Sequence, residues 1–412
     1  MSLMRWLARG LGLTDRHGWA QGVSSNSTAG KVVTVDTAMQ LAAVWACVRL
    51  ISETIATLPM LVYKRGPDDE RVVASDHPLY GLLHDSPHAD YTAVEFWEGM
   101  AAGLCLWGNG YAEKKFVGQR LVALEPLRSD GMTVVRKTNG AREYRYSGYG
   151  AARVLSEDQV LHIRGFGVAG DVGLSPISMA RHSLGAAMAA DETASKMFAN
   201  GVRPTGILTV DQVLKGEQRD AIKKNIVEPM AGSGNAGGLF LLEAGMKFQP
   251  ITMTPEDAQF LETRGFNIEE ICRWFRVPPF MVGHTQKSTS WGTGLEQQLI
   301  GFLTFALRPY LTRIEQSVRR SLIPAAERGS LFAEFKVEGL LRADSAARAN
   351  FYAIMVTNGI MSRNEIRGLE NLPRKLGADD LTVQAQNVPL GTQPAKTTDT
   401  PPPPEDDEED KP

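Results

Sequence analysis

Glycine-rich stretches are the first places where this chain could do chemistry. The run from Gly232 to Gly238 could cradle a phosphate, because backbone N–H groups in such loops can face an anion. It lacks the lysine and hydroxyl of GxxxxGK[ST], so a tight turn is the favoured interpretation. A second pattern, Gly165 to Gly170, follows a strand-like run without the rest of a dinucleotide-binding unit. Neither stretch predicts a nucleotide site.

Histidines and cysteines offer little more. His162, beside Arg164 at the end of a strand-like run, could act as an acid or base, but a structural histidine is favoured. His84 and His88 have i,i+4 spacing, but Pro87 opposes a shared helical face, so no metal site is predicted. The cysteines form no CxxC pair and are expected in the core, in a reducing compartment: Cys47, Cys105 and Cys272. We therefore expect no enzyme and no cofactor.

The charge of the chain is unevenly distributed. The 412 residues carry a formal net charge of −3, whereas Thr392–Pro412 alone holds seven acids and two lysines. That segment contributes −5, so the remainder is about +2, which is low for a protein that grips DNA tightly. No apolar run approaches the ~18 residues of a membrane span, so no membrane partner is expected.

Hydrophobic spacing and capping signals predict mixed helices and strands. A helix over Thr37–Thr57 is expected, with Asp36 as its cap, and Thr92 with Glu95 predicts a second helix that ends near Gly108. An antiparallel meander is expected between Tyr111 and Ile163. The other expected helices are Pro176–Asn200, Glu217–Met230, Pro255–Arg276, Thr293–Ile323 with a kink at Pro309, Ala343–Thr357 and Ser362–Glu370. The other expected strands are Met60–Lys64, Ile207–Val210, Leu239–Leu242, Phe248–Met253 and Phe332–Val337.

A series of short strings, in a consistent order, resembles one family. They include "AVWACVRLISETIATLPMLVYKR" (Ala43–Arg65), "GNGYAE" (Gly108–Glu113), "HIRGFG" (His162–Gly167), "GLSPISMAR" (Gly173–Arg181), "FANGVRPTGIL" (Phe198–Leu208), "DAQFLETRGFNIEEICRWFRVPP" (Asp257–Pro279) and "NGIMSRNEIR" (Asn358–Arg367). Together they are similar to the portal proteins of long-tailed double-stranded DNA bacteriophages, from about Asp36 to Leu372. The chain is identified as a suspected member of that family.

The resemblance implies an α+β portal fold, divided into named regions. These are a flexible N-terminal arm (1–35), an α/β wing (36–175 and 293–339, with the long kinked helix), a two-helix stem (176–200 and 254–277), a small β-α-β-β clip (201–253), a tunnel loop (278–292), a short helical crown (340–375) and a disordered acidic Pro-rich tail (376–412). The tail composition independently predicts disorder.

The resemblance also implies a function and a set of partners. A portal is a cyclic homo-oligomer of roughly a dozen subunits at the capsid vertex. It serves procapsid assembly, genome packaging, head–tail joining and DNA ejection. The implied partners are double-stranded DNA bound without regard to sequence, the terminase motor, the major capsid protein or scaffold, and head–tail connector proteins. Assembly is expected in the bacterial host cytoplasm, before the protein becomes part of the virion.

The candidate DNA-contacting residues lie in the tunnel loop and the second stem helix. Lys287 is the one cation of its loop, where ring symmetry would repeat it around the bore, although a solvated loop charge is an equal alternative. Trp291 is favoured as a core anchor. The loop candidates are Gln286, Lys287, Ser288, Thr289 and Ser290. The stem candidates are Arg264, Arg273 and Arg276.

Two other functions stay open from the sequence alone. The chain could be another structural capsid or connector protein, or, less favoured, a DNA-packaging enzyme such as a nuclease or ATPase. Nucleotide hydrolysis would separate the enzyme from both structural alternatives.

Overall fold

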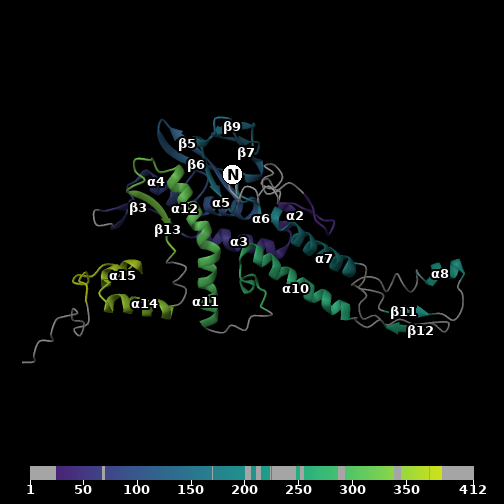
Figure 1. The fold of residues 1–412 in the computed structure, drawn as a ribbon. Helices are drawn as coiled ribbons and strands as arrows, with labels where there is room; N and C mark the ends of the chain where they lie inside the picture. Colours follow the sequence, from purple (N-terminus) through teal and green to yellow (C-terminus); the bar gives the residue numbers. More distant parts are fainter. Residues whose placement is uncertain are drawn as a thin grey trace, which may run out of the picture. The chain divides into compact units, whose positions relative to one another are not determined.

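The computed structural model of the chain combines helices with several small antiparallel sheets (Figure 1). It describes residues 25–66, 70–168, 170–199, 206–209, 215–222, 224, 247–250, 255–285, 293–337, 345–370 and 372–382. The chain divides into two compact units, Met1–Lys336 and Val337–Pro412, and each is described by itself.

The first unit opens with a short hairpin and two helices. Strand β1 (Ser25–Asn26) pairs with β2 (Val32–Val33), and α2 (Val35–Met39) is followed by α3 (Ala42–Ala56). The prediction of one helix capped by Asp36 was wrong. The Thr34 hydroxyl accepts a hydrogen bond from the Thr37 N–H at 3.1 Å, so the helix begins two residues earlier and Asp36 lies in its first turn. The backbone then breaks near Leu41, which adopts an extended conformation.

A three-stranded antiparallel sheet joins distant parts of this unit. Strand β3 (Met60–Arg65) pairs with both β4 (Arg71–Val73) and β13 (Leu331–Phe335). Strands β3 and β13 lie close to their predicted positions, whereas β4 was not predicted. Helix α5 (Ala93–Trp107) packs against α3, and its predicted Thr92–Glu95 capping box is confirmed. Between them lie α4 (Pro78–Tyr80) and a π-helical turn, η1 (Gly81–Asp85), whose Leu83 carbonyl accepts a 3.1 Å hydrogen bond from the buried Trp97 indole.

The strands after α5 form two sheets, so the prediction of one meander was wrong. Both sheets are antiparallel, as expected. One has the order β10-β5-β6, with β5 at Asn109–Val117, β6 at Arg120–Leu127 and β10 at Val160–Arg164. The other has the order β7-β8-β9, with β7 at Met132–Arg136, β8 at Arg142–Tyr146 and the unpredicted β9 at Arg153–Ser156.

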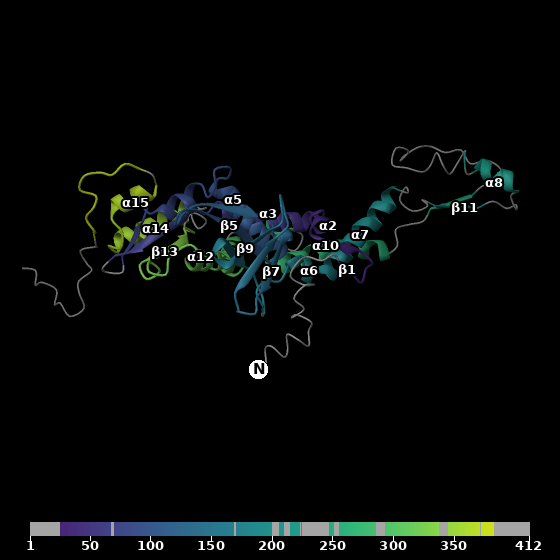
Figure 2. The same cartoon turned by 90° about the horizontal axis from the view of Figure 1, so that it is seen from above.

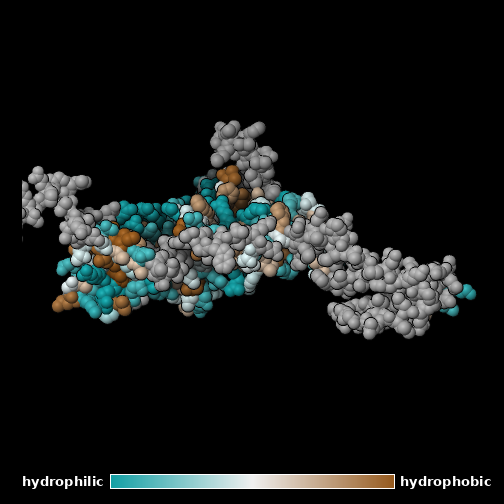
Figure 3. All heavy atoms as spheres, turned by 90° about the horizontal axis from the view of Figure 1, so that it is seen from below, coloured by the Kyte–Doolittle hydropathy of each residue, from teal (hydrophilic) through white to brown (hydrophobic). Residues whose placement is uncertain are grey.

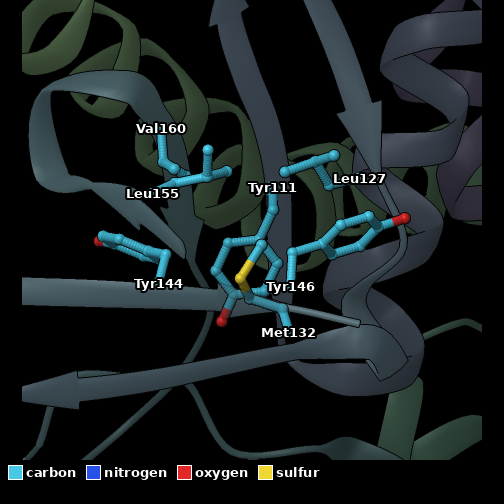
Figure 4. Packing of buried hydrophobic residues seen from close by; sticks show 7 residues of the cluster. All are labelled: Tyr111, Leu127, Met132, Tyr144, Tyr146, Leu155 and Val160. Atoms are coloured by element: carbon cyan, nitrogen blue, oxygen red, sulfur yellow. The ribbon is translucent and has the colours of Figure 1, made fainter. Parts of the chain in front are cut away.

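A buried cluster holds the two sheets together, as Figure 4 shows. Its residues come from all six strands, and their burial removes apolar surface of both sheets from water. The rings of Tyr111 and Tyr144 meet edge to face, with centroids 6.3 Å apart. The cluster consists of Tyr111, Leu127, Met132, Tyr144, Tyr146, Leu155 and Val160.

Two long helices run side by side after the sheets (Figures 1 and 2). They are α7 (Arg181–Ala199) and α10 (Pro255–Phe275). The Ser183 hydroxyl donates to Glu270 Oε1 at 2.8 Å and accepts from the Trp274 indole at 3.3 Å, which ties the pair together. The helix predicted over Pro176–Asn200 is broken: Ser175 caps α6 (Pro176–Met179), which ends at Ala180, before α7 begins.

Short elements are described between these two helices. They are β11 (Gly206–Thr209), α8 (Gly216–Ile222) and β12 (Lys247–Pro250), and β11 pairs with β12 in a two-stranded antiparallel sheet. The predicted strand Leu239–Leu242, the glycine turn 232–238 and the end of the predicted helix Glu217–Met230 lie outside the described residues.

The long helix predicted with a kink at Pro309 changes helix type just before that proline. Helix α11 (Thr293–Gly301) passes into a π-helical segment, η7 (Phe302–Leu307), and then into α12 (Arg308–Ser321). Proline has no N–H to donate to the carbonyl four residues earlier, which belongs to Phe305. The π-helical segment immediately before Pro309 lies where the regular helical hydrogen bond is missing.

The second unit contains two described helices, α14 (Ser345–Thr357) and α15 (Arg363–Leu369). Both were predicted, and the Ser362–Glu365 capping box is confirmed. The Tyr352 hydroxyl donates to Glu370 Oε1 at 2.7 Å and links the two helices. The predicted N-terminal arm up to residue 24 and the tail from residue 383 lie outside the described residues.

Candidate nucleic-acid interface

The candidate tunnel-loop residues all lie outside the described residues. This applies to Gln286, Lys287, Ser288, Thr289, Ser290 and also Trp291. Arg264 lies on α10, but the description of side chains on that helix begins at residue 265. The structure therefore describes the surroundings of two of the eight candidates, Arg273 and Arg276.

Arg273 is an exposed cation with a partial counter-charge. Its side chain is 60% exposed, and its Nη2 lies 3.5 Å from Glu269 Oε2 one turn earlier. The guanidinium also lies 5.2 Å from the centre of the Phe266 ring, on the preceding turns of α10. The 3.5 Å separation is long for an ion pair and most of the Arg273 side chain faces solvent, so its guanidinium stays accessible to an external anion.

Arg276 marks the end of α10 and has an unusual backbone. Its φ of +58° is the left-handed conformation, which costs a non-glycine residue roughly 1 kcal/mol. The chain then turns at Pro278 into η6 (Pro279–Val282). Arg276 Nη1 lies 3.5 Å from the carbonyl oxygen of Phe305, the carbonyl that Pro309 leaves without its usual donor. Arg276 therefore connects the end of α10 to the helix break.

An open pocket of about 380 Å³ lies at this end of α10. Arg273 and Arg276 both line it, whereas nothing is described of Arg264 there. The lining residues are Glu269, Cys272, Arg273, Arg276, Val277, Pro278 and Pro279. Two stem candidates thus come together beside the start of the predicted tunnel loop.

His162 is a half-buried residue whose hydrogen bonds favour a structural role. Its Nε2 donates to Asn109 Oδ1 at 3.0 Å, and the same oxygen accepts from the Gly173 N–H at 2.7 Å. The Tyr144 hydroxyl lies 3.3 Å from Nδ1 and donates to it. Burial, with the nearby positive charges of Arg142 and others, lowers the pKa of His162 to about 3. A neutral ring with both nitrogens engaged favours the structural interpretation over an acid–base role.

Glycines from three of the family-like strings meet beside this histidine. Gly108 ends α5 with φ +73°, and its carbonyl accepts a 2.8 Å hydrogen bond from the Gly165 N–H. A Cβ atom on Gly108 would collide with the backbone of Leu174, and one on Gly173 would collide with Gly108. Gly108, Gly165 and Gly173 therefore serve close backbone packing, since a Cβ on Gly165 would also lie 2.6 Å from the Gly108 carbonyl oxygen.

The three cysteines are buried and free, as predicted for core residues. Burial raises the pKa of the Cys105 thiol to about 12, so it stays protonated and unreactive. Among the described residues, no cluster of His, Cys, Asp and Glu could hold a metal ion. No described helix has the length and apolar character needed to cross a membrane.

Comparison with known proteins decides the family. The family model for phage portal proteins matches residues 42–371. The chain belongs to the phage portal protein family. The portal protein of Enterobacteria phage HK97 is 40% identical over 395 residues, which cover 94% of this chain and 92% of that protein. The probable portal protein of Streptomyces phage phiC31 is 35% identical over 368 residues, or 85% of this chain and 79% of that protein.

A solved structure extends the likeness to the fold. The neck of a native gene transfer agent particle, computed with C12 symmetry, has a TM-score of 0.59 and 24% identity to this chain. The match covers 90% of this chain and all of that one. The α+β class is thereby confirmed. This portal protein is a structural component of a phage capsid and its virion.

Proposed function

We propose that this portal protein forms a closed ring of about a dozen copies, through which double-stranded DNA enters and leaves the capsid. The observation that carries the proposal is the family match over residues 42–371 together with 40% identity to the HK97 portal protein. The similar neck structure with C12 symmetry supports the cyclic arrangement.

The predicted regions give this ring its parts. In the proposal, residues 36–175 and 293–339 form the wing, 176–200 and 254–277 the stem, 201–253 the clip, and 340–375 the crown. The side-by-side course of α7 and α10 supports a two-helix stem. The pocket beside Arg273 and Arg276 supports a place for the tunnel loop next to the stem, since Pro278, where the predicted loop begins, lines the same pocket.

Side chains exposed on the single chain also favour assembly. Large apolar residues such as Trp45, Phe266 and Phe305 are 49%, 50% and 71% exposed. Hydrophobic patches interrupt the hydrophilic face drawn in Figure 3. Contiguous exposed apolar surface is typical of a protein that awaits a partner, and neighbouring subunits of a ring would cover it.

A nearly neutral body suits passage of DNA. A duplex carries one charge per ~1.7 Å, so a stem of ~33 Å passes roughly 19 phosphates at once. Every basic residue recurs in each subunit of a ring, so one arginine per chain already makes a cationic belt. Several uncompensated belts would hold DNA too tightly to slide, and the Glu269 carboxylate beside Arg273 limits that attraction.

In this proposal the ring is a passive conduit and docking platform. The terminase motor would supply the energy for packaging, because the Gly232–Gly238 run lacks the lysine of a phosphate-binding loop. The other proposed partners are the major capsid protein or scaffold and head–tail connector proteins, and assembly would take place in the host cytoplasm.

Electron microscopy of the purified protein tests the proposal. We expect closed rings with a central hole, and no turnover of ATP by the ring alone. A monomer at all micromolar concentrations and salt conditions would contradict the ring. Nucleotide hydrolysis that disappears on a point mutation in this chain would contradict the passive conduit.

A further inference from the structure

A second pocket, rich in arginine, lies where β8, β10 and α12 meet. It is open to solvent and has a volume of about 260 Å³. Its lining contains four arginines and two acids, Glu157 and Asp171, so the formal charge of the lining is +2. The arginines are Arg142, Arg164, Arg313 and Arg320. A concave surface with this excess attracts anions.

Both acids of the lining are already paired. Asp171 Oδ1 lies 3.1 Å from Arg142 Nε, and the same carboxylate binds Arg136, outside the pocket. These guanidinium groups lower the pKa of Asp171 to about 2. Glu157 Oε1 lies 2.8 Å from Arg142 Nη1 and 3.5 Å from Arg320 Nη2. The acids therefore compensate Arg142, Arg136 and, in part, Arg320.

The other two arginines are fixed by backbone carbonyls. Arg164 Nη1 donates to the Gly170 carbonyl at 2.6 Å, and Arg313 Nη1 donates to the Gly165 carbonyl at 2.9 Å. Within the described part of the chain, neither guanidinium has a carboxylate at ion-pair distance. Each hydrogen bond orients a planar guanidinium group but uses only some of its five N–H donors. The remaining donors are available to a ligand.

The rest of the lining offers donors and few free acceptors. His162 is neutral and uses both ring nitrogens within the protein, so it neither adds charge nor accepts from a ligand. Hydroxyls of Ser317 and Ser321 lie on the α12 side. The volume corresponds to roughly eight or nine waters at ~30 Å³ each, enough for a tetrahedral oxyanion with some of its hydration.

We propose that this pocket binds a phosphate-type oxyanion, with Arg164 and Arg313 as its principal ligands. A dianion matches the excess of two charges, and its several oxygens can accept from both forks at once, which a single carboxylate does less well. Free inorganic phosphate and the phosphodiester of a nucleic acid share this chemistry. The inference stands independently of the ring and of the conduit function.

Calorimetric titration of the purified full-length protein with inorganic phosphate tests the site, in a buffer free of other oxyanions. We expect binding that weakens about tenfold or more in Arg313→Gln and in Arg164→Gln, since each loses a charged fork. Glu157→Gln should bind phosphate severalfold more tightly, because it removes the negative charge beside Arg142 and Arg320. That opposite change cannot result from general damage to the fold.

Arg319→Gln is the matched control. Arg319 lies on the same helix and donates to the Arg328 carbonyl, but it does not line the pocket, so its loss should change phosphate affinity less than twofold. Displacement of bound phosphate by a short DNA duplex would identify the phosphodiester as the ligand, whereas displacement by sulfate alone would identify a free oxyanion. Absent phosphate binding, or equal affinities in wild type, Arg313→Gln and Glu157→Gln, would overturn the proposal.

Discussion

Position 108 favours glycine for two reasons. The backbone there is left-handed, and there is no space for a side chain. We expect Gly108→Ala to destabilise the protein by more than about 2 kcal/mol, because a Cβ would collide with the Leu174 backbone as well as strain φ. Gly118→Ala is the control: Gly118 has φ +63° but open space around it, so only the strain of about 1 kcal/mol remains. Chemical denaturation measures both, and equal losses would contradict the packing argument.

His162 makes folding stability depend on pH. Its pKa is about 3 in the folded protein against an ordinary value of 6.5, so the unfolded chain takes up the proton first as pH falls. The stability contributed by the neutral ring is complete above pH 6.5 and is lost progressively between 6.5 and 3. We expect His162→Gln to lose less thermal stability than wild type between about pH 7.5 and pH 5. An equal fall in melting temperature in the two proteins between pH 7.5 and pH 5 would contradict this.

Lys287 remains the sharpest prediction for DNA contact, although it lies outside the described residues. If a ring repeats this cation around the bore, Lys287→Ala should assemble normally but retain packaged DNA less well. Any lost DNA affinity should be independent of sequence, greatest at low salt, and worth about one unit of salt slope per phosphate contact. Normal assembly, packaging and retention in the variant would make Lys287 a solvated loop charge.

At the scale of elements, local signals were readable and tertiary ones were not. The capping boxes at Thr92 and Ser362 lie within four consecutive residues, so the sequence alone predicted both helix starts. The division of the strands into two sheets depends on pairing between segments far apart, such as β10 with β5. The breaks at Leu41 and Ala180 likewise interrupt helices that hydrophobic periodicity predicts as continuous.

The arginine pocket illustrates the same limit for a candidate site. Its arginines come from β8, β10 and α12, and no motif or spacing connects them in the sequence. Arg313 and Gly165, whose contact fixes one wall, are 148 residues apart. By contrast, Arg273 and Arg276 are only three residues apart, so their common location at the end of α10 was predictable from the sequence.

The start of α5 provides a test of the predicted capping box. The Thr92 hydroxyl accepts from the Glu95 N–H at 3.3 Å, and Glu95 Oε2 accepts from the Thr92 N–H at 2.8 Å. Thr92→Ala should cost about 1 kcal/mol of stability, because the N–H of Glu95 loses its acceptor. Thr92→Ser keeps the hydroxyl and should stay within a few tenths of a kcal/mol of wild type. Denaturation midpoints compare the three, and an unaffected Thr92→Ala would show that the box contributes nothing.

For the whole molecule, the distribution of charge separates the family-like body from the end of the chain. The family match stops at residue 371, and the acids are concentrated beyond Thr392. In the proposed ring, attraction to DNA would come from a few basic residues that the symmetry repeats, because the body alone is close to neutral. The net charge of one chain would then give little indication of DNA binding.

Deletion of Gly391–Pro412 tests whether the acidic end matters for assembly. A Pro-rich run with so many like charges has little apolar surface to bury, so we expect the truncated chain to form the same rings as the full one. Removal of about five negative charges should raise its isoelectric point and change its elution from an ion exchanger, which confirms the deletion in the assembled state. Light scattering and electron microscopy compare the two proteins at equal concentration. Aggregation or loss of the ring would show that these residues stabilise contacts between subunits.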